Sequence, residues 1–289
     1  VFHPMAAATD AELLFANLGS AGGLFAFANV SLRRGGAIGL PRGVPAKDVD
    51  IVTRADFAQR TAKVQDDWLR FLGDVEAGYF AEMRDFLREI GLRAPVVGTQ
   101  QNYSQYAAQA RMDVGDMHVY WGRHARVDDT WWQMDNRPMI ADRNGAVLPR
   151  AAGHRLDGRP FIVTEWGVKS ANTYATEADL MMFAFASLQD WDGVFIYNYS
   201  NVADLRADRF RGDLGFNGHW NRFVALVPAA LMFLRGDVRA AQRSIQVSAT
   251  PDRLISFARR FGPAPSAYQL ADLPPRYALH HRIAVTIGP

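Results

Sequence analysis

Residues 160–167 read PFIVTEWG, an apolar run that turns polar only near its end. Three further runs have the same character: residues 94–100 (APVVGTQ), 114–120 (VGDMHVY) and 193–199 (GVFIYNY). Strands that are apolar on both faces and alternate with helices are typical of a parallel sheet covered by helices. The four runs therefore predict an α/β fold with parallel strands.

Apolar residues recur at spacings of three and four in residues 54–91, 176–188 and 221–237, which predicts three helices. In the second of these, Thr176 and Asp179 form a pair like a capping box at the helix start. The C-terminal residues differ, because short apolar runs lie there among several prolines. They predict strands of a small β appendage at residues 244–247, 254–257 and 283–287.

Each predicted strand of the parallel sheet carries polar or aromatic residues at its C-terminal end, the end where parallel α/β folds bind ligands. These candidates are Gln100, Asn102, His118, Tyr120, Glu165, Tyr197 and Asn198. Glu165 is the sharpest of them, because a carboxylate at the end of an apolar strand is costly to bury unless something uses it. The alternative is a glutamate that merely pairs with one of the many arginines.

In residue order and spacing, the chain resembles the clan A glycoside hydrolases, retaining enzymes built on a (β/α)8 barrel. Residues 161–167 resemble their strand seven, and the similarity extends from about Asp67 to Asp237, more than half of the chain. The other matching segments resemble strand five (96–100), strand six (116–121), strand eight (193–199) and the last helix of β-galactosidase-like and cellulase-like members (231–238). The resemblance implies a barrel-like catalytic domain at 1–240, with 1–53 poorly assigned, followed by a small β-rich extension at 241–289.

The resemblance also implies a reaction. Glu165 would be the nucleophile that attacks the anomeric carbon of a β-linked oligo- or polysaccharide, while a second carboxyl group about 5–5.5 Å away acts as acid and then as base. His118 or Tyr120 would hydrogen-bond Glu165 and orient it. Trp121, Trp166 and the loop residues Trp131 and Trp132 would stack on sugar rings. Substrate contacts would also come from Gln100, Asn102, Tyr197 and Asn198.

The chain departs from the family pattern in two ways. The acid of the family follows an asparagine at the end of strand four, and no Asn-Glu pair occurs in this sequence. Strands one to four are also hard to find ahead of Arg54, which implies that the N-terminal half of the barrel is missing or rearranged. Three interpretations stay open: a glycoside hydrolase whose acid is unidentified, a catalytically impaired carbohydrate-binding relative, or an incomplete barrel that needs a partner chain, for example as a homodimer.

Composition excludes several other classes. The 289 residues include no cysteine, so disulfides and thiolate sites are impossible, and the net charge of +2 is too small to imply a nucleic-acid partner. No apolar run is long enough to span a membrane. No phosphate-binding glycine motif appears and the seven histidines are not at metal-ligand spacing, so we expect no cofactor and no metal. No export signal follows Val1, although enzymes that degrade polysaccharides are commonly exported.

Overall fold

A computed structural model describes residues 39, 43–49, 51–126, 132–200, 203, 205 and 213–289. By contacts the chain divides into two compact units, residues 1–68 and 69–289, and the boundary falls inside a long helix. The first unit contains η1 (Ala46–Asp48), α1 (Arg54–Phe57) and the start of α2 (Ala62–Glu89). The predicted helix over residues 54–91 is therefore confirmed, with an interruption after α1 and an end at Gly91, whose φ is +95°.

The second unit contains the predicted parallel sheet. Its strands are β1 (Gly115–Trp121), β4 (Phe161–Val168) and β5 (Gly193–Ile196), in the order β1-β4-β5 with both pairings parallel. The run at 94–100 contributes only a single parallel bridge, from Val97 to Val114. The four apolar runs thus lie side by side in sequence order, and the expectation of a mixed α/β fold with parallel strands is confirmed.

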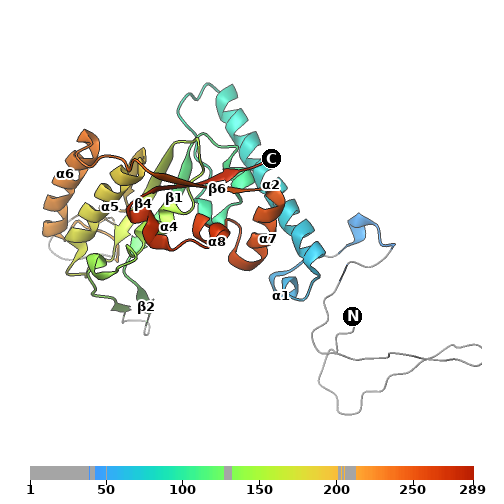
Figure 1. Cartoon of the computed structure of the whole chain (residues 1–289), viewed down its shortest axis with the longest axis horizontal. Coiled ribbons are helices and arrows are strands. Elements are labelled where there is room, and N and C mark those ends of the chain that lie inside the picture. Colours follow the sequence, from blue (N-terminus) through green and yellow to red (C-terminus); the bar gives the residue numbers. More distant parts are fainter. Residues whose placement is uncertain are drawn as a thin grey trace, which may run out of the picture. The chain divides into compact units, whose positions relative to one another are not determined.

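Helices connect the strands. η2 (Gln101–Tyr103) and α3 (Tyr106–Gln109) precede β1, η3 (Met139–Ala141) and α4 (Leu148–Ala152) precede β4, α5 (Ala175–Gln189) precedes β5, and α6 (Trp220–Arg235) follows it. α5 and α6 lie side by side (Figure 1). A short antiparallel pair, β2 (His124–Arg126) and β3 (Trp132–Met134), interrupts the long segment after β1.

The capping prediction for α5 is wrong. The helix begins at Ala175, one residue before Thr176, and its N-cap residue Tyr174 makes no side-chain capping bond. Asp179 is fully buried instead and pairs with Arg222 on α6. The Asp179 side chain therefore forms a tertiary ion pair, and not the capping bond at the helix start that the local sequence pattern predicts.

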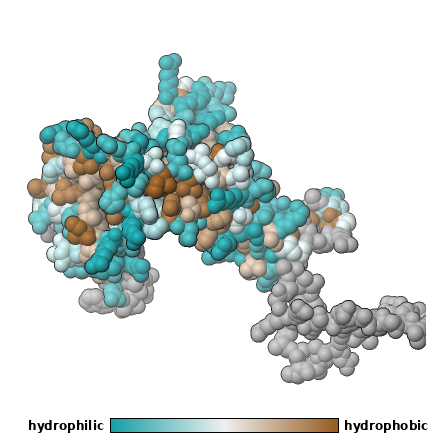
Figure 2. Space-filling model, in the orientation of Figure 1, coloured by the Kyte–Doolittle hydropathy of each residue, from teal (hydrophilic) through white to brown (hydrophobic). Residues whose placement is uncertain are grey.

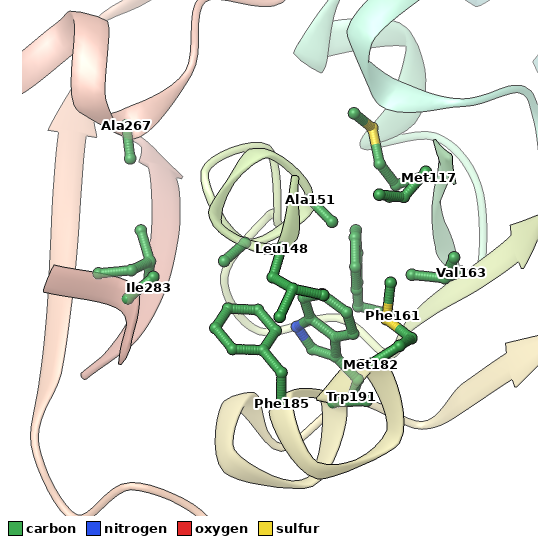
Figure 3. Close-up of a cluster of buried hydrophobic side chains, with 14 of the residues drawn as sticks. Met117, Leu148, Ala151, Phe161, Val163, Met182, Phe185, Trp191, Ala267 and Ile283 are labelled. Atoms are coloured by element: carbon green, nitrogen blue, oxygen red, sulfur yellow. The ribbon is translucent and has the colours of Figure 1, made fainter. Parts of the chain in front are cut away.

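One face of the sheet forms the core. Met117, Phe161 and Val163 are fully buried and belong to the same cluster as Met182 of α5 and Leu148 of α4 (Figure 3). Strand alternation sends residues 117, 119 and 121 of β1 to this face. The residues between them, at 116, 118 and 120, belong to the opposite face.

The C-terminal residues form strands at two of the three predicted places, 244–247 and 283–287, but helices lie between them. β6 (Ser244–Ala249) and β7 (Arg282–Ile287) pair in parallel, and α7 (Pro251–Phe261), α8 (Ala267–Ala271) and η4 (Pro275–Leu279) lie between them. The predicted strand at 254–257 is part of α7, because Leu254, Ile255 and Ala258 bury one helical face. Several of these residues share the core cluster of the sheet, including Val247, Leu254 and Ile283.

None of the helices in the described ranges is both long enough and apolar enough to cross a membrane.

In the described part of the chain, the three sheets are separate and no set of strands closes into a barrel. The (β/α)8 closure therefore stays a prediction.

Candidate functional site

Glu165 lies near the C-terminal end of β4 and contacts two residues of β1. The Tyr120 hydroxyl donates a hydrogen bond to Glu165 Oε2. His118 Nδ1 lies 3.2 Å from the same oxygen. These three residues were expected together from strand order alone, and the structure brings them together.

A β-bulge in β4 determines which way Glu165 points. Met117 is opposite Val163, but the next residue of β1, His118, is opposite Glu165, so Thr164 is an extra residue in the ladder. Plain alternation from the buried Val163 would send Glu165 to the core face. The bulge instead places Thr164 and Glu165 consecutively beside Asp116 and His118, and returns the following residue to the core.

The residues of the site differ in their exposure to solvent. The side chains of Glu165 and His118 are 28% and 23% exposed, whereas that of Asp116 is only 4% exposed. Asp116 Oδ2 lies 3.5 Å from His118 Nε2. Glu165 is therefore within reach of a solute, and a buried carboxylate lies behind it on the far side of the imidazole.

Tyr197 completes one side of this cluster. Its ring meets the Tyr120 ring edge-on, with centroids 6.3 Å apart and an interplanar angle of 85°. The next residue, Asn198, follows a cis peptide bond, and its Oδ1 is shielded without a hydrogen-bond partner in the described part of the chain. Tyr197 thus joins the Glu165 cluster through Tyr120, whereas no recorded contact joins the Asn198 side chain to Glu165.

Trp166 does not lie at the rim of the site, as the sugar-stacking prediction requires. It is fully buried, and its Nε1 donates a 2.8 Å hydrogen bond to Asp179 Oδ1. The reason is the bulge, after which Trp166 returns to the core face. Its rings have no open face for a sugar, so we leave Trp166 out of the proposed site.

Trp121 is also packed. Its Nε1 donates to the Arg137 carbonyl at 3.1 Å, and the Arg137 guanidinium lies 5.3 Å from the centre of its ring. Sugar stacking on Trp121 would require Arg137 to move. Trp131 lies outside the described residues, as does the side chain of Trp132.

Gln100 and Asn102 are half-buried at the start of η2, and no contact recorded in the described ranges joins either of them to Glu165. Their neighbour Gln101 is fully buried beside the start of β1, where a Cβ on Gly115 would come within 2.8 Å of Gln101 Nε2. The sequence analysis missed Gln101 and also Asp116. Asp116 could have been found, because it precedes His118 by two residues and so shares its strand face.

Within the described ranges, no other Asp or Glu shares a hydrogen-bond or ion-pair partner with Glu165, except Asp116 through His118. The same residues contain no group of three or more His, Asp or Glu arranged to hold a metal ion. The arrangement therefore holds the Glu165 carboxylate in one orientation, partly exposed, in a cluster that includes the rings of Tyr120 and Tyr197.

Comparison of the chain with protein-family models, with curated proteins and with solved structures finds no match in any of the three.

Proposed function

We propose that the chain is a retaining glycoside hydrolase of the (β/α)8 type that cleaves β-glycosidic bonds of oligo- or polysaccharides, with Glu165 as the nucleophile. The observation that carries the proposal is the way Glu165 is held. Tyr120 and His118 both contact Oε2, while Oε1 has no hydrogen bond among the described residues. A carboxylate fixed through one oxygen presents the other for attack.

In the proposed reaction, Glu165 Oε1 forms a bond to the anomeric carbon while the glycosidic C–O bond breaks. The leaving oxygen takes a proton from an acid, and a water molecule then hydrolyses the glycosyl-enzyme. The contacts of Glu165 provide orientation but no second exposed carboxylate. In this proposal the acid comes from an aspartate or from another chain.

Strand order supports the barrel interpretation. Val97, β1, β4 and β5 are parallel neighbours in sequence order, as four consecutive barrel strands would be. The helices that precede and follow these strands in the sequence, α2 and α6, expose apolar side chains, and Figure 2 shows hydrophobic residues over α6. Further strands and helices on those flanks would bury them, in line with an incomplete barrel that needs a partner chain.

One observation favours a second candidate function, that of a carbohydrate-binding relative with impaired catalysis. The sequence contains no Asn-Glu pair to supply the acid of the family pattern, yet exposed aromatic rings occur along and just beyond β5 at Phe195 and Tyr199. Aryl glycosides with good leaving groups separate the two functions, because their departure needs little help from an acid. A binding relative would bind sugars but leave these substrates intact.

Glu165→Gln tests the leading proposal. It keeps the size of the side chain but removes its nucleophilic charge, so we expect kcat/KM for aryl glycosides to fall on the order of 10³-fold. Glu177→Gln is the matched control: Glu177 is also half-buried and accepts a backbone hydrogen bond, from Ile140 N at 3.2 Å, but it does not contact Glu165. Unchanged turnover in Glu165→Gln would refute the proposal.

A further inference from the structure

Asp116 is a buried acid that the proposed reaction does not use. Its side chain is 4% exposed, and burying a carboxylate is costly unless it is paired and hydrogen-bonded. Thr164 satisfies one oxygen, because its backbone N and its Oγ1 donate to Asp116 Oδ1 at 3.0 and 2.7 Å. The other oxygen, Oδ2, faces His118 Nε2 at 3.5 Å.

The imidazole of His118 therefore lies between two carboxylates and meets each with a different ring nitrogen. Nε2 faces Asp116, and Nδ1 lies 3.2 Å from Glu165 Oε2. In the part of the chain that the structure describes, His118 is the one basic side chain recorded against either carboxylate. An ionised carboxylate can only accept hydrogen bonds, so each of these two contacts needs a donor N–H on the ring nitrogen that faces it.

From this geometry we infer that Asp116 is a positioning residue, which accepts a hydrogen bond from His118 Nε2 and so holds the imidazole in the orientation that contacts Glu165. The bulge in β4 contributes to this positioning. The same extra residue that turns Glu165 to the open face brings both donors of Thr164 onto Asp116. The catalytic consequence rests on the proposed function, whereas the hold on His118 does not.

The hold on His118 is measured in the free protein. NMR of protein labelled with 15N in its histidines reports the protonation of each ring nitrogen, and His118→Gln assigns the signals. At one near-neutral pH, we expect Asp116→Asn to shift both ring nitrogen signals of His118. Asp113→Asn is the matched control, because Asp113 also accepts from a backbone N–H, that of Val96 at 2.8 Å, yet pairs with Arg88 rather than with His118.

Thr164→Val provides a second variant that keeps the carboxylate. It keeps the branched shape suited to a strand and removes only the hydroxyl donor, so we expect a smaller change of the same His118 signals. This variant keeps the inference testable should Asp116→Asn fail to fold. If Asp116→Asn folds and its His118 signals are unchanged, the inference is overturned. If only Thr164→Val folds, unchanged His118 signals in that variant overturn it.

Kinetics with aryl glycosides separate this inference from the proposed function. We expect Asp116→Asn to lower kcat roughly 10-fold with little change in KM, because Glu165 loses orientation rather than substrate contact. A wild-type chain that hydrolyses no glycoside, but whose His118 signals shift in Asp116→Asn, would refute the proposed function and support the positioning role. A wild-type chain that hydrolyses a glycoside, together with unshifted His118 signals in Asp116→Asn, would support the proposed function and refute the positioning role.

Discussion

Gly167 lies directly behind the Glu165 cluster, where the chain has no room for a side chain. A Cβ at this position would come within 2.9 Å of Tyr120 Cδ1 and within 2.8 Å of the Tyr197 carbonyl oxygen. Contacts this short force their surroundings to move. The Leu214 Cδ2 atom would also lie only 2.8 Å away, so the added methyl group would displace the Leu214 side chain, the backbone at Tyr197 and the Tyr120 ring, whose hydroxyl is bound to Glu165.

We therefore expect Gly167→Ala to lower activity on aryl glycosides and to destabilise the fold by about 1–3 kcal/mol, the usual effect of overpacking. Gly78→Ala is the control, because a Cβ there meets nothing within 4 Å and alanine favours the helix that contains it. Thermal unfolding and turnover measure the two effects. Equal behaviour of the two variants would contradict the packing argument.

His154 is a titratable residue held in the core. Burial, and secondarily the nearby charge of Arg150, lower its pKa to about 4 from the usual 6.5. Between those two pH values the unfolded chain binds a proton that the folded chain does not. Stability from this group is therefore complete above about pH 6.5 and is lost as the pH falls toward 4.

The expected loss from His154 is about 3 kcal/mol, taking 1.36 kcal/mol for each pKa unit. His154→Leu removes the titrating group and should flatten this part of the stability profile, as measured by urea unfolding at a series of pH values. His280→Leu, at an exposed histidine, should keep the wild-type slope. A slope unchanged in His154→Leu would show that other groups cause the acid loss.

At the scale of residues, the sequence predicts a large part of the candidate site. Strand order places His118, Tyr120 and Glu165 at the same edge of the sheet, whereas strict alternation from Val163 would send Glu165 to the core face and Trp166 to the open face. The bulge at Thr164 shifts the alternation by one residue and so reverses both positions, and nothing in the local composition predicts that bulge. The packing of Trp121 against Arg137 and the position of η2 likewise depend on tertiary contacts that a single sequence does not reveal.

At the scale of elements, one buried ion pair joins β4, α5 and α6. Arg222 Nε and Nη2 donate to the two carboxylate oxygens of Asp179 at 2.7 and 3.0 Å, and Trp166 Nε1 donates to one of them. Both charged side chains are fully buried. This pair anchors the two helices to the strand that carries Glu165.

Breaking the pair should be strongly destabilising, because it leaves a buried charge without its partner. We expect Asp179→Asn to lower the free energy of unfolding by about 3–5 kcal/mol. Asp237→Asn removes the partner of Arg235 in an exposed pair, and should change stability by less than about 1 kcal/mol. Denaturant unfolding compares them, and a small loss in both variants would contradict an anchoring role.

Helices with long apolar stripes are predicted correctly, as are the strands at 244–247 and 283–287, whereas the run at 254–257 is not. The run at 254–257 is four residues long, so its apolar pattern fits a strand and a helix equally well. Thr250 and Pro251 supply the missing information, since the threonine side chain accepts from Arg253 N and the proline occupies the first turn of α7. These residues are a helix-start signal that the strand interpretation overlooked.

At the scale of the whole molecule, two helices expose apolar stripes. On α2 and at Ile90, just beyond its end, the stripe is formed by side chains that are 37–64% exposed: Phe71, Leu72, Val75, Tyr79, Met83, Phe86 and Ile90. On α6 it is formed by side chains that are 45–77% exposed: Trp220, Phe223, Val224, Val227, Leu231 and Leu234. Apolar patches larger than a few hundred Å² are unusual on monomers and mark interaction surfaces.

In a purified sample we expect another copy of the chain to cover these stripes. We expect light scattering to give a mass above the 32.2 kDa of one chain, and Val227→Asp with Leu231→Asp to lower it. Arg239→Asp, outside both stripes, is the control. A wild-type mass of 32.2 kDa at every concentration tested would contradict coverage by a second copy.

The central claim is that Glu165 acts as a nucleophile on sugars. Activated 2-fluoro aryl glycosides test it most directly, because they trap the glycosyl-enzyme without needing the acid. The intact mass would be measured after incubation with a small panel of them, and the modified peptide mapped. We predict one sugar per chain, attached to Glu165. A folded chain that gains no mass from any sugar, or gains it elsewhere, would contradict the claim.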